Sequence, residues 1–155
     1  MNALGKDAAA LVKCLYGVDE ITETAGSSPE PAESNGLAIN CAPSSLGFRA
    51  NGIGFAITAE AVLQAAETLV LTANLQESAD GSTGWADITD PATVLTLTGD
   101  TGGSTERGGA VLAFDLGRTT KDYVRVQVTP VFSAADTDTC SIHADVLFTG
   151  IDQLG

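Results

Sequence analysis

The chain has 155 residues, and its 20 acidic and 7 basic side chains give a net charge of −13. This length suits one domain with a hydrophobic core, and 44% hydrophobic residues argue against a disordered chain. Because affinity for nucleic acid and for anionic lipid depends on clustered Lys and Arg, the composition excludes both as general partners. Neither a membrane-spanning apolar run nor a signal-peptide pattern is visible, so we expect synthesis in a reducing cytoplasm.

Residues 1–36 are predicted to form an N-terminal arm and linker. Five apolar residues follow one another at helical spacing: Leu4, Ala8, Leu11, Leu15 and Val18. This spacing predicts a short helix or arm within residues 2–18, which needs a partner chain to pack against it. Residues 19–36 contain two prolines, four Glu and little that is apolar, which is typical of an extended and mobile linker.

Residues 37–155 are predicted to form one antiparallel all-β domain. Short alternating runs are separated by turn residues, and no long helical period interrupts them. The clearest runs are residues 68–78, 94–98, 112–116, 122–129 and 142–148. With residues 37–40 and 54–58 included, seven or eight strands result, which fits a β-sandwich or jelly roll.

A hairpin motif follows the strand at residues 68–78. Its members are Gln76, Ser78, Asp80, Gly81, Ser82, Trp85 and Asp87. Asp80 and Ser82 are expected to bond nearby backbone amides, and Gly81 is expected to adopt a positive φ. Trp85 is expected to return over the edge of the core and fix the register. The motif is therefore interpreted as structural, although Trp85 is also the residue that would stack on a sugar.

This motif resembles a recurrent segment of small virion proteins from tailed bacteriophages: a strand, Gln-Xaa-Ser-Xaa-Asp-Gly-Ser, then an aromatic residue and Asp. A second partial match is the strand Tyr123-Val-Arg-Val-Gln-Val-Thr-Pro-Val. Together the two segments cover about a third of the chain, and such proteins include head decoration, or cement, proteins. The resemblance implies a β-sandwich that sits on the capsid exterior, with the major capsid protein and further copies of itself as partners, assembled as trimers.

Residues suited to catalysis or to metal binding are few. His143 is the only histidine, and its place in an alternating strand predicts that it faces solvent or an interface beside Asp145. Neither a second His nor a Gly-Xaa-Ser-Xaa-Gly motif accompanies it. Asp136, Asp138 and the segment 80–87 lack the spacing of an EF-hand and are interpreted as solvated turns. We therefore expect no enzyme, no metal and no cofactor.

Three cysteines lack metal-site spacing and are expected to be reduced, although Cys41 and Cys140 are the pair to consider for a disulfide. Three basic residues lie close together in the sequence: Arg118, Lys121 and Arg125. With Leu4, Leu11 and Leu15 of the arm, they are the predicted contacts with a capsid or a neighbouring subunit, and ion pairs in solvent are the alternative.

The sequence thus predicts a structural virion protein that binds and stabilises a phage capsid from outside by many protein contacts. One alternative is a neck, tail-tube or head-completion protein, because tube-forming subunits also use β-sandwiches. A second alternative is a carbohydrate-binding module with Trp85 and Tyr123 as stacking platforms.

Overall fold

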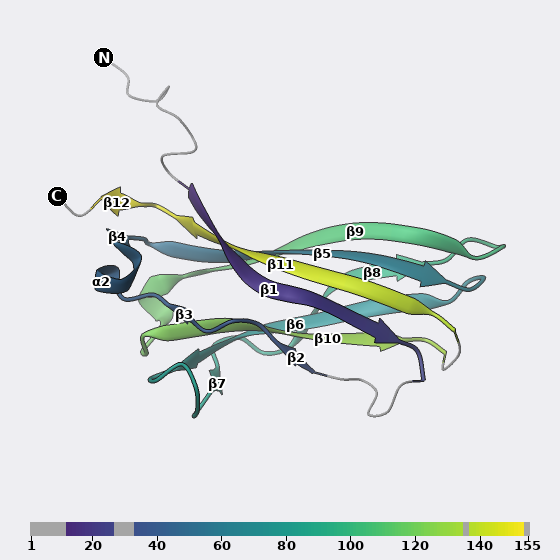
Figure 1. Ribbon diagram of the computed structural model, residues 1–155, viewed down its shortest axis with the longest axis horizontal. Coiled ribbons are helices and arrows are strands. Elements are labelled where there is room, and N and C mark those ends of the chain that lie inside the picture. Colours follow the sequence, from purple (N-terminus) through teal and green to yellow (C-terminus); the bar gives the residue numbers. More distant parts are fainter. Residues whose placement is uncertain (1–11, 27–32, 135–136, 154–155) are drawn as a thin grey trace, which may run out of the picture.

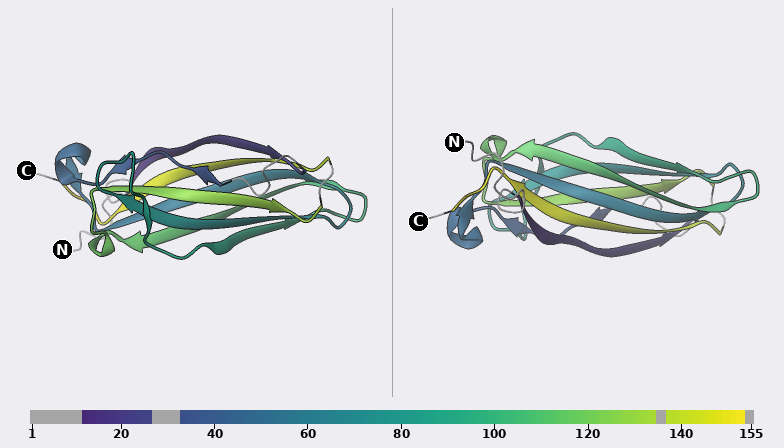
Figure 2. Two further views of the ribbon diagram at one scale, coloured as in Figure 1. Left: turned by 90° about the horizontal axis from the view of Figure 1, so that it is seen from below. Right: turned by 90° about the horizontal axis from the view of Figure 1, so that it is seen from above.

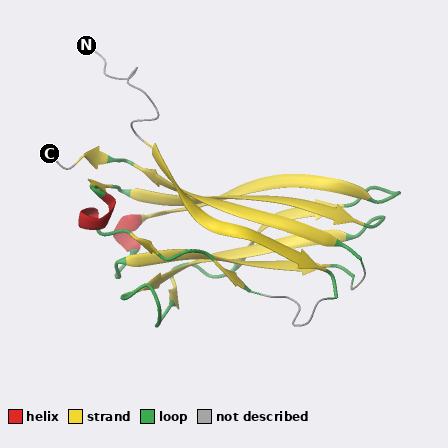
Figure 3. Ribbon diagram, viewed as in Figure 1, coloured by secondary structure: helices red, strands yellow, loops and turns green. Residues whose placement is uncertain are grey.

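The structure is a computed structural model that describes residues 12–26, 33–134 and 137–153, except for the side chains of residues 12–19, Arg118, Asp152 and Gln153. Two antiparallel sheets pack face to face, with long strands that run along the length of the molecule (Figures 1 and 2). Figure 3 shows how little of the described chain is helical. The predicted all-β sandwich is confirmed.

Sheet A consists of four long strands in the order β1, β11, β5 and β9. Their bounds are Val12–Thr24 for β1, Thr139–Thr149 for β11, Gly52–Leu63 for β5 and Ser104–Asp115 for β9. β5 pairs with β11 on one side and with β9 on the other along almost its whole length. β1 and β9 are therefore the edges of this sheet.

Sheet B has two long central strands with shorter strands beside them. The central strands are β10 (Tyr123–Phe132) and β6 (Thr68–Ser78). β10 pairs on its other side with β2 (Ser34–Asn35) and β3 (Ile39–Asn40). β6 pairs on its other side with β7 (Ala86–Asp87) and β8 (Ala92–Thr98). Both edges of sheet B are therefore interrupted.

The strand order is that of a jelly roll. With β2 and β3 taken as one interrupted strand, sheet A contains the first, eighth, third and sixth strands along the chain. Sheet B then contains the second, seventh, fourth and fifth strands. This order corresponds to two Greek keys folded into a double-sheet jelly roll. The jelly roll is thus the better of the two predicted architectures.

The core lies between the two sheets and explains the alternation in the sequence. On β10, Val124, Val126 and Val128 are almost completely buried, whereas the residues between them are half-buried on the outer face. β11 and β5 follow the same period, with Ile142 and Phe55 fully buried. Each such side chain contributes about 1.5 to 3 kcal/mol of burial free energy, so a shift by one residue would expose the whole inward set.

The predicted N-terminal helix is wrong over residues 12–18, which form β1 and pair with β11 from Val12 opposite Thr149 onward. A helix of that length is marginal in water, and Gly17 disfavours it further. Register shifts on both sides of Val18 interrupt the strand alternation that would have revealed β1. Residues 19–24 also belong to β1, so the predicted linker is wrong there, and the sandwich includes part of the predicted arm. Residues 1–11 and 27–32 lie outside the described residues.

Helical structure in the described residues is limited to short segments at one end of the sandwich. α2 (Pro43–Leu46) begins with a proline and ends at Gly47, whose φ of 72° closes the helix in the left-handed region. η2 (Leu116–Arg118) is a single 3-10 turn capped by the Asp115 carboxylate. β4 (Phe48–Arg49) pairs with β12 (Asp152–Gln153) beside α2. None of the described helices is long enough to cross a membrane.

Candidate functional site

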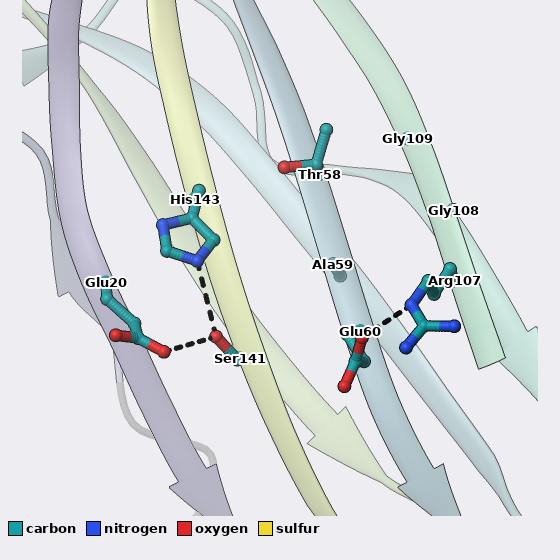
Figure 4. A pocket seen from close by; sticks show the side chains of 9 residues that line it. All are labelled: Glu20, Thr58, Ala59, Glu60, Arg107, Gly108, Gly109, Ser141 and His143. Atoms are coloured by element: carbon teal, nitrogen blue, oxygen red, sulfur yellow. Dashed lines mark hydrogen bonds and ion pairs between the residues drawn. The ribbon is translucent and has the colours of Figure 1, made fainter. Parts of the chain in front are cut away.

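A groove of about 630 Å³ crosses the outer face of sheet A, the face turned away from sheet B (Figure 4). It is lined by residues from all four strands of the sheet: Glu20, Thr58, Ala59, Glu60, Arg107, Gly108, Gly109, Ser141 and His143. From β9, Arg107 contributes a side chain to the groove, and Gly108 and Gly109 contribute backbone only. A Cβ at Gly108 would come within 2.9 Å of Leu95 and Leu97. Close packing of β9 against β8 therefore requires this glycine.

The polar side chains of the groove form two separate sets of contacts, as Figure 4 shows. Ser141 Oγ donates a hydrogen bond to Glu20 Oε1 over 2.8 Å and lies 3.4 Å from His143 Nε2. Across the sheet, Arg107 Nε and Glu60 Oε2 form an ion pair at 2.5 Å. Both members of this ion pair are largely exposed, so it contributes little to the stability of the fold.

The order of these contacts does not match a nucleophilic triad. In a triad the histidine lies between the serine and the carboxylate, so that it accepts the serine proton and is oriented by the acid. Here the Ser141 hydroxyl is directed to Glu20 instead, and His143 lies at the far side of the serine. Most of the side chains that line the groove are polar, but their contacts do not form a catalytic triad.

His143 is exposed on the outer face of β11, as predicted, and Asp145 follows on the same face. Within the described parts of the chain, three His, Cys, Asp or Glu side chains never come together in a way that could hold a metal ion. Asp138, predicted to be a solvated turn residue, is instead buried, and its Oδ1 accepts a hydrogen bond from the backbone N–H of Gln64 over 2.8 Å. Asp136 lies outside the described residues.

The hairpin motif forms a tight loop after β6. Ser78 Oγ accepts from the backbone N–H groups of Asp80 and Gly81 and donates to the Thr83 carbonyl. Asp80 Oδ1 accepts from the N–H groups of Ser82 and Thr83, both over 2.8 Å. These backbone hydrogen bonds, together with one from the Thr83 hydroxyl, hold the pKa of Asp80 well below its ordinary value. The expected role of Asp80 is therefore present, whereas the side chain that supports the turn is Ser78, not Ser82.

Gly81 lies at the centre of this loop with a φ of 73°. A Cβ at this position would lie 2.6 Å from the ring of Tyr123, the first residue of β10. The position therefore requires glycine both for its backbone conformation and for its close approach to the ring.

The other motif residues form a polar network on the outer face of sheet B. Asp87 Oδ1 accepts from Asn74 Nδ2 over 2.7 Å and from Gln76 Nε2 over 2.8 Å. Gln76 Oε1 in turn accepts from Arg125 Nε over 2.8 Å. Asn74 is 2% exposed and Gln76 9% exposed although both side chains point away from the core. The motif loop and the neighbouring strands thus cover the side chains of Asn74 and Gln76 on this face.

Trp85 does not cover the core edge as expected. It lies half-buried on the outer face, with the Arg125 guanidinium 4.2 Å from the centre of its ring. The reason is the pairing of β7 with Gln76 and Glu77, because Gln76 is itself opposite Arg125 in β10. A cation over the face of Trp is a favourable arrangement, and it occupies a ring face that a sugar would need.

The predicted basic cluster and the motif are close together in space. Lys121 Nζ donates to the Gly84 carbonyl over 3.3 Å, and Arg125 contacts Gln76 and Trp85 as described. Although burial opposes it, hydrogen bonds from Thr120 and the charge of Lys121 lower the pKa of Glu77. The loop before β10 is therefore tied to the end of β6.

The remaining predicted contact residues cannot all be placed. Arg118 lies in η2 and Leu15 in β1, but their side chains are among those not described. Leu4 and Leu11 lie outside the described residues. Their proposed role at a capsid or subunit interface stays a prediction.

Cys41 and Cys140 are both free thiols, so the disulfide considered between them is not present. Burial, with the Asp122 charge, raises the pKa of Cys41 to about 12. Burial likewise raises the pKa of Cys140 to about 11. Both thiols behave as small apolar groups, as the reduced interpretation predicts.

Sequence reasoning missed the members of the sheet A groove other than His143, because Glu20, Glu60, Arg107 and Ser141 come from four strands far apart in the chain. Strand alternation puts Asn74 on the outward face of its strand, but nothing in the sequence revealed its hydrogen bond with Asp87. The one available signal was the alternation that puts Ser141, His143 and Asp145 on one face.

Neither a protein-family model nor a curated protein sequence matches this chain. Similar folds occur in solved virus structures. A chain of infectious bursal disease virus Gt strain superposes with a TM-score of 0.52 and 13% identity, covering 89% of this chain and 32% of that one. A chain of the infectious bursal virus derived T=1 particles superposes with a TM-score of 0.51 and 12% identity, covering 89% of this chain and 31% of that one. A chain of the Gx strain superposes with a TM-score of 0.50 and 9% identity, covering 93% of this chain and 33% of that one.

These neighbours are chains of virus structures and of virus-derived particles, and the likeness to them is one of fold. The present chain spans about a third of the length of the chains it matches. At 9 to 13% identity the likeness is one of fold alone.

Proposed function

We propose that this chain is a structural virion protein that binds the outside of a tailed-phage capsid and stabilises the shell, in other words a decoration or cement protein. Its partners are the major capsid protein and further copies of itself. It is made in the host cytoplasm and acts without catalysis, cofactor or metal.

The observation that carries the proposal is the jelly roll itself, which extends over most of the described chain and is shared with capsid proteins of virus particles. The segment from Gln76 to Asp87, which resembles the phage motif, adds to it, because its side chains form hydrogen bonds within the loop and with β6. The groove on sheet A is open and polar, and is thus suited to surface contacts.

The physical basis of stabilisation is multivalency. Each copy contributes a modest interface, and many copies bridging capsid subunits add their contacts without any single contact being strong. The net charge of −13 would also keep a crowded particle surface soluble, because like-charged exteriors repel one another.

The test is a comparison of phage particles assembled with and without this protein. We expect cryo-imaging to show extra density on the outer shell of the complete particles, and the depleted ones to break at lower temperature. Adding the purified chain back should restore both properties. Equal thermal stability together with unchanged outer density would contradict the proposal, and rings formed by the purified protein would instead favour a neck or tail role.

Paired variants test the predicted basic contact. Arg118→Glu removes a basic residue of the predicted interface, whereas Arg49→Glu makes the same charge change on β4, outside it. We expect Arg118→Glu to weaken binding to depleted particles by about tenfold or more, since a misplaced charge in an interface costs several kcal/mol. Equal effects of the two variants would exclude a specific contact at Arg118.

A further inference from the structure

The outer edge of β9 is a long, unprotected strand edge. β9 has twelve residues, and β5 is its only strand partner among the described residues. Exposed edges readily pair with another strand, so proteins commonly shorten them or place charges along them. Sheet B follows that rule with its interrupted edges, whereas residues 108–114 of β9 carry no charge at all.

Apolar side chains accompany this edge. Val111, on the outer face, is 66% exposed. On the inner face Leu112 of β9 and Val94 and Leu95 of β8 are only partly buried, although they pack against the core. The seam between β8 and β9 is thus one of the places where the core is incompletely covered, and a strand added at β9 would cover it.

The sequence of β9 is complementary to itself about Val111. Arg107 lies four residues before Val111 and Asp115 four residues after it, and strand alternation puts all three on the outer face. In an antiparallel pair centred on Val111, each Arg107 faces Asp115 of the other copy and the two valines face each other. On the inner row Gly108 faces Phe114 and Ala110 faces Leu112, a small residue opposite a large one each time.

We propose that two copies of this chain associate through β9, antiparallel about a two-fold axis at Val111, so that the two four-stranded sheets become one sheet of eight strands. Such a contact is isologous and closes at two copies. In each copy Arg107 keeps its ion pair with Glu60, and Asp115 keeps the hydrogen bond that its Oδ1 accepts from Gly117 N over 2.8 Å.

The charge pattern of β9 identifies a second copy of this chain as the partner that pairs with this edge. A chain of net charge −13 repels its own copies over most of its surface, whereas this edge is uncharged from Gly108 to Phe114, with Glu106 and Arg107 before that stretch and Asp115 after it. Antiparallel self-pairing brings opposite charges together twice. The pairing does not rest on capsid binding, and it gives a two-fold contact in place of the trimer that the phage resemblance implies.

Sedimentation of the full chain tests the proposal. We expect the unmodified protein to be a dimer at micromolar concentration, and Val111→Lys to raise the dimer dissociation constant at least about tenfold, since it sets two like charges opposite each other. Leu37→Lys is the matched control, because Leu37 is 51% exposed and lies outside β9. A monomeric unmodified protein, or a dimer that Val111→Lys leaves intact, would overturn the proposal.

Disulfide trapping tests the register. Opposed Cα atoms in an antiparallel pair lie about 4.5 or 5.5 Å apart, and a disulfide spans about 4.4 to 6.8 Å. Val111→Cys should therefore cross-link two copies in mild oxidant, in a Cys14→Ser background whose remaining native thiols are Cys41 and Cys140. Burial raises the pKa of both, which makes them poor nucleophiles, so the background protein alone should stay uncrosslinked. A larger ring without the cross-link would show that β9 pairs with a different strand and would refute the proposal.

Discussion

The outer faces of the two sheets differ in how far their polar side chains are buried. On sheet B, a loop and a short strand fold back over the face, and Asp87 holds two side chains, Asn74 and Gln76, out of solvent. On sheet A, the polar side chains of the groove remain exposed, and the one ion pair there joins two largely exposed partners. Both sheets pack on the same core, but among the described residues the buried polar side chains Asn74 and Gln76 lie on the outer face of sheet B.

The edges repeat this difference. The edges of sheet B are broken into short strands, whereas β9 of sheet A presents twelve residues with Val111 exposed beside it. Polar groups that are buried must be satisfied within the protein, while exposed groups can exchange their partners with water or with another protein. Asn74 and Gln76 of sheet B are thus satisfied within the protein, whereas the exposed side chains of the sheet A groove can exchange their partners.

The largest effect is expected from Asp87→Ala on sheet B. The change removes the acceptor that Asn74 Nδ2 and Gln76 Nε2 share, and it leaves Gln76 Nε2 only its 3.5 Å contact with Gln127 Oε1. We expect a loss of about 3 kcal/mol in the free energy of unfolding, measured by urea denaturation. Asp90→Ala, an exposed aspartate three residues on, should change stability by less than about 0.5 kcal/mol. Equal losses would mean that the network does not seal this face.

The second effect concerns the loop that closes the same face. Gly81→Ala should cost about 2 kcal/mol, because alanine is strained at a φ of 73° and its Cβ would lie 2.6 Å from the Tyr123 ring. Gly84→Ala is the matched control: its φ is 60°, yet nothing lies within 4 Å of the added Cβ. Thermal unfolding should therefore place Gly84→Ala between the unmodified chain and Gly81→Ala, and the reverse order would refute the packing argument.

The third substitution also removes a short contact, but its effect on the free energy of unfolding should be small. Glu60→Gln removes the ion pair with Arg107 on sheet A, and both partners are largely exposed. We expect a change of less than about 0.5 kcal/mol in unfolding free energy, measured at a concentration low enough to keep the chain monomeric. A loss comparable with that of Asp87→Ala would remove the contrast between the two faces.

The central strands were predictable because burial on one face imposes a period of two, which Leu69 to Leu75 and Val124 to Val128 both follow. The first strand, β1, was not predictable, because Gly17 and the register shifts beside Val18 break that period and leave leucines at helical spacing. Local turn chemistry also revealed the role of Asp80 and Gly81, since their partners are within a few residues.

Contacts between distant strands were beyond the reach of the sequence. The partners of the motif, Arg125 and Tyr123, lie more than 35 residues after it, and nothing local states which residue of β10 is opposite Gln76. The same is true of the groove, where Glu60 meets Arg107 only because β5 and β9 pair in one register. A single sequence contains the alternation of each strand but not the register between strands.

The smallest effect is the contribution of the Asp80 charge to stability, which is present at neutral pH and lost in acid. Its pKa is lowered in the folded chain by hydrogen bonds from the amides of Thr83 and Ser82, so between the folded and unfolded pKa values the unfolded chain binds more protons. This contribution to stability is fully present above about pH 4, the ordinary range of an aspartate, and is lost as the pH falls toward the folded value. Asp80→Asn should therefore be less stable than the unmodified chain at neutral pH, and the difference should shrink below pH 4. Urea denaturation at a series of pH values measures this, and a difference that stays constant into acid would mean that the charge of Asp80 does not hold the loop.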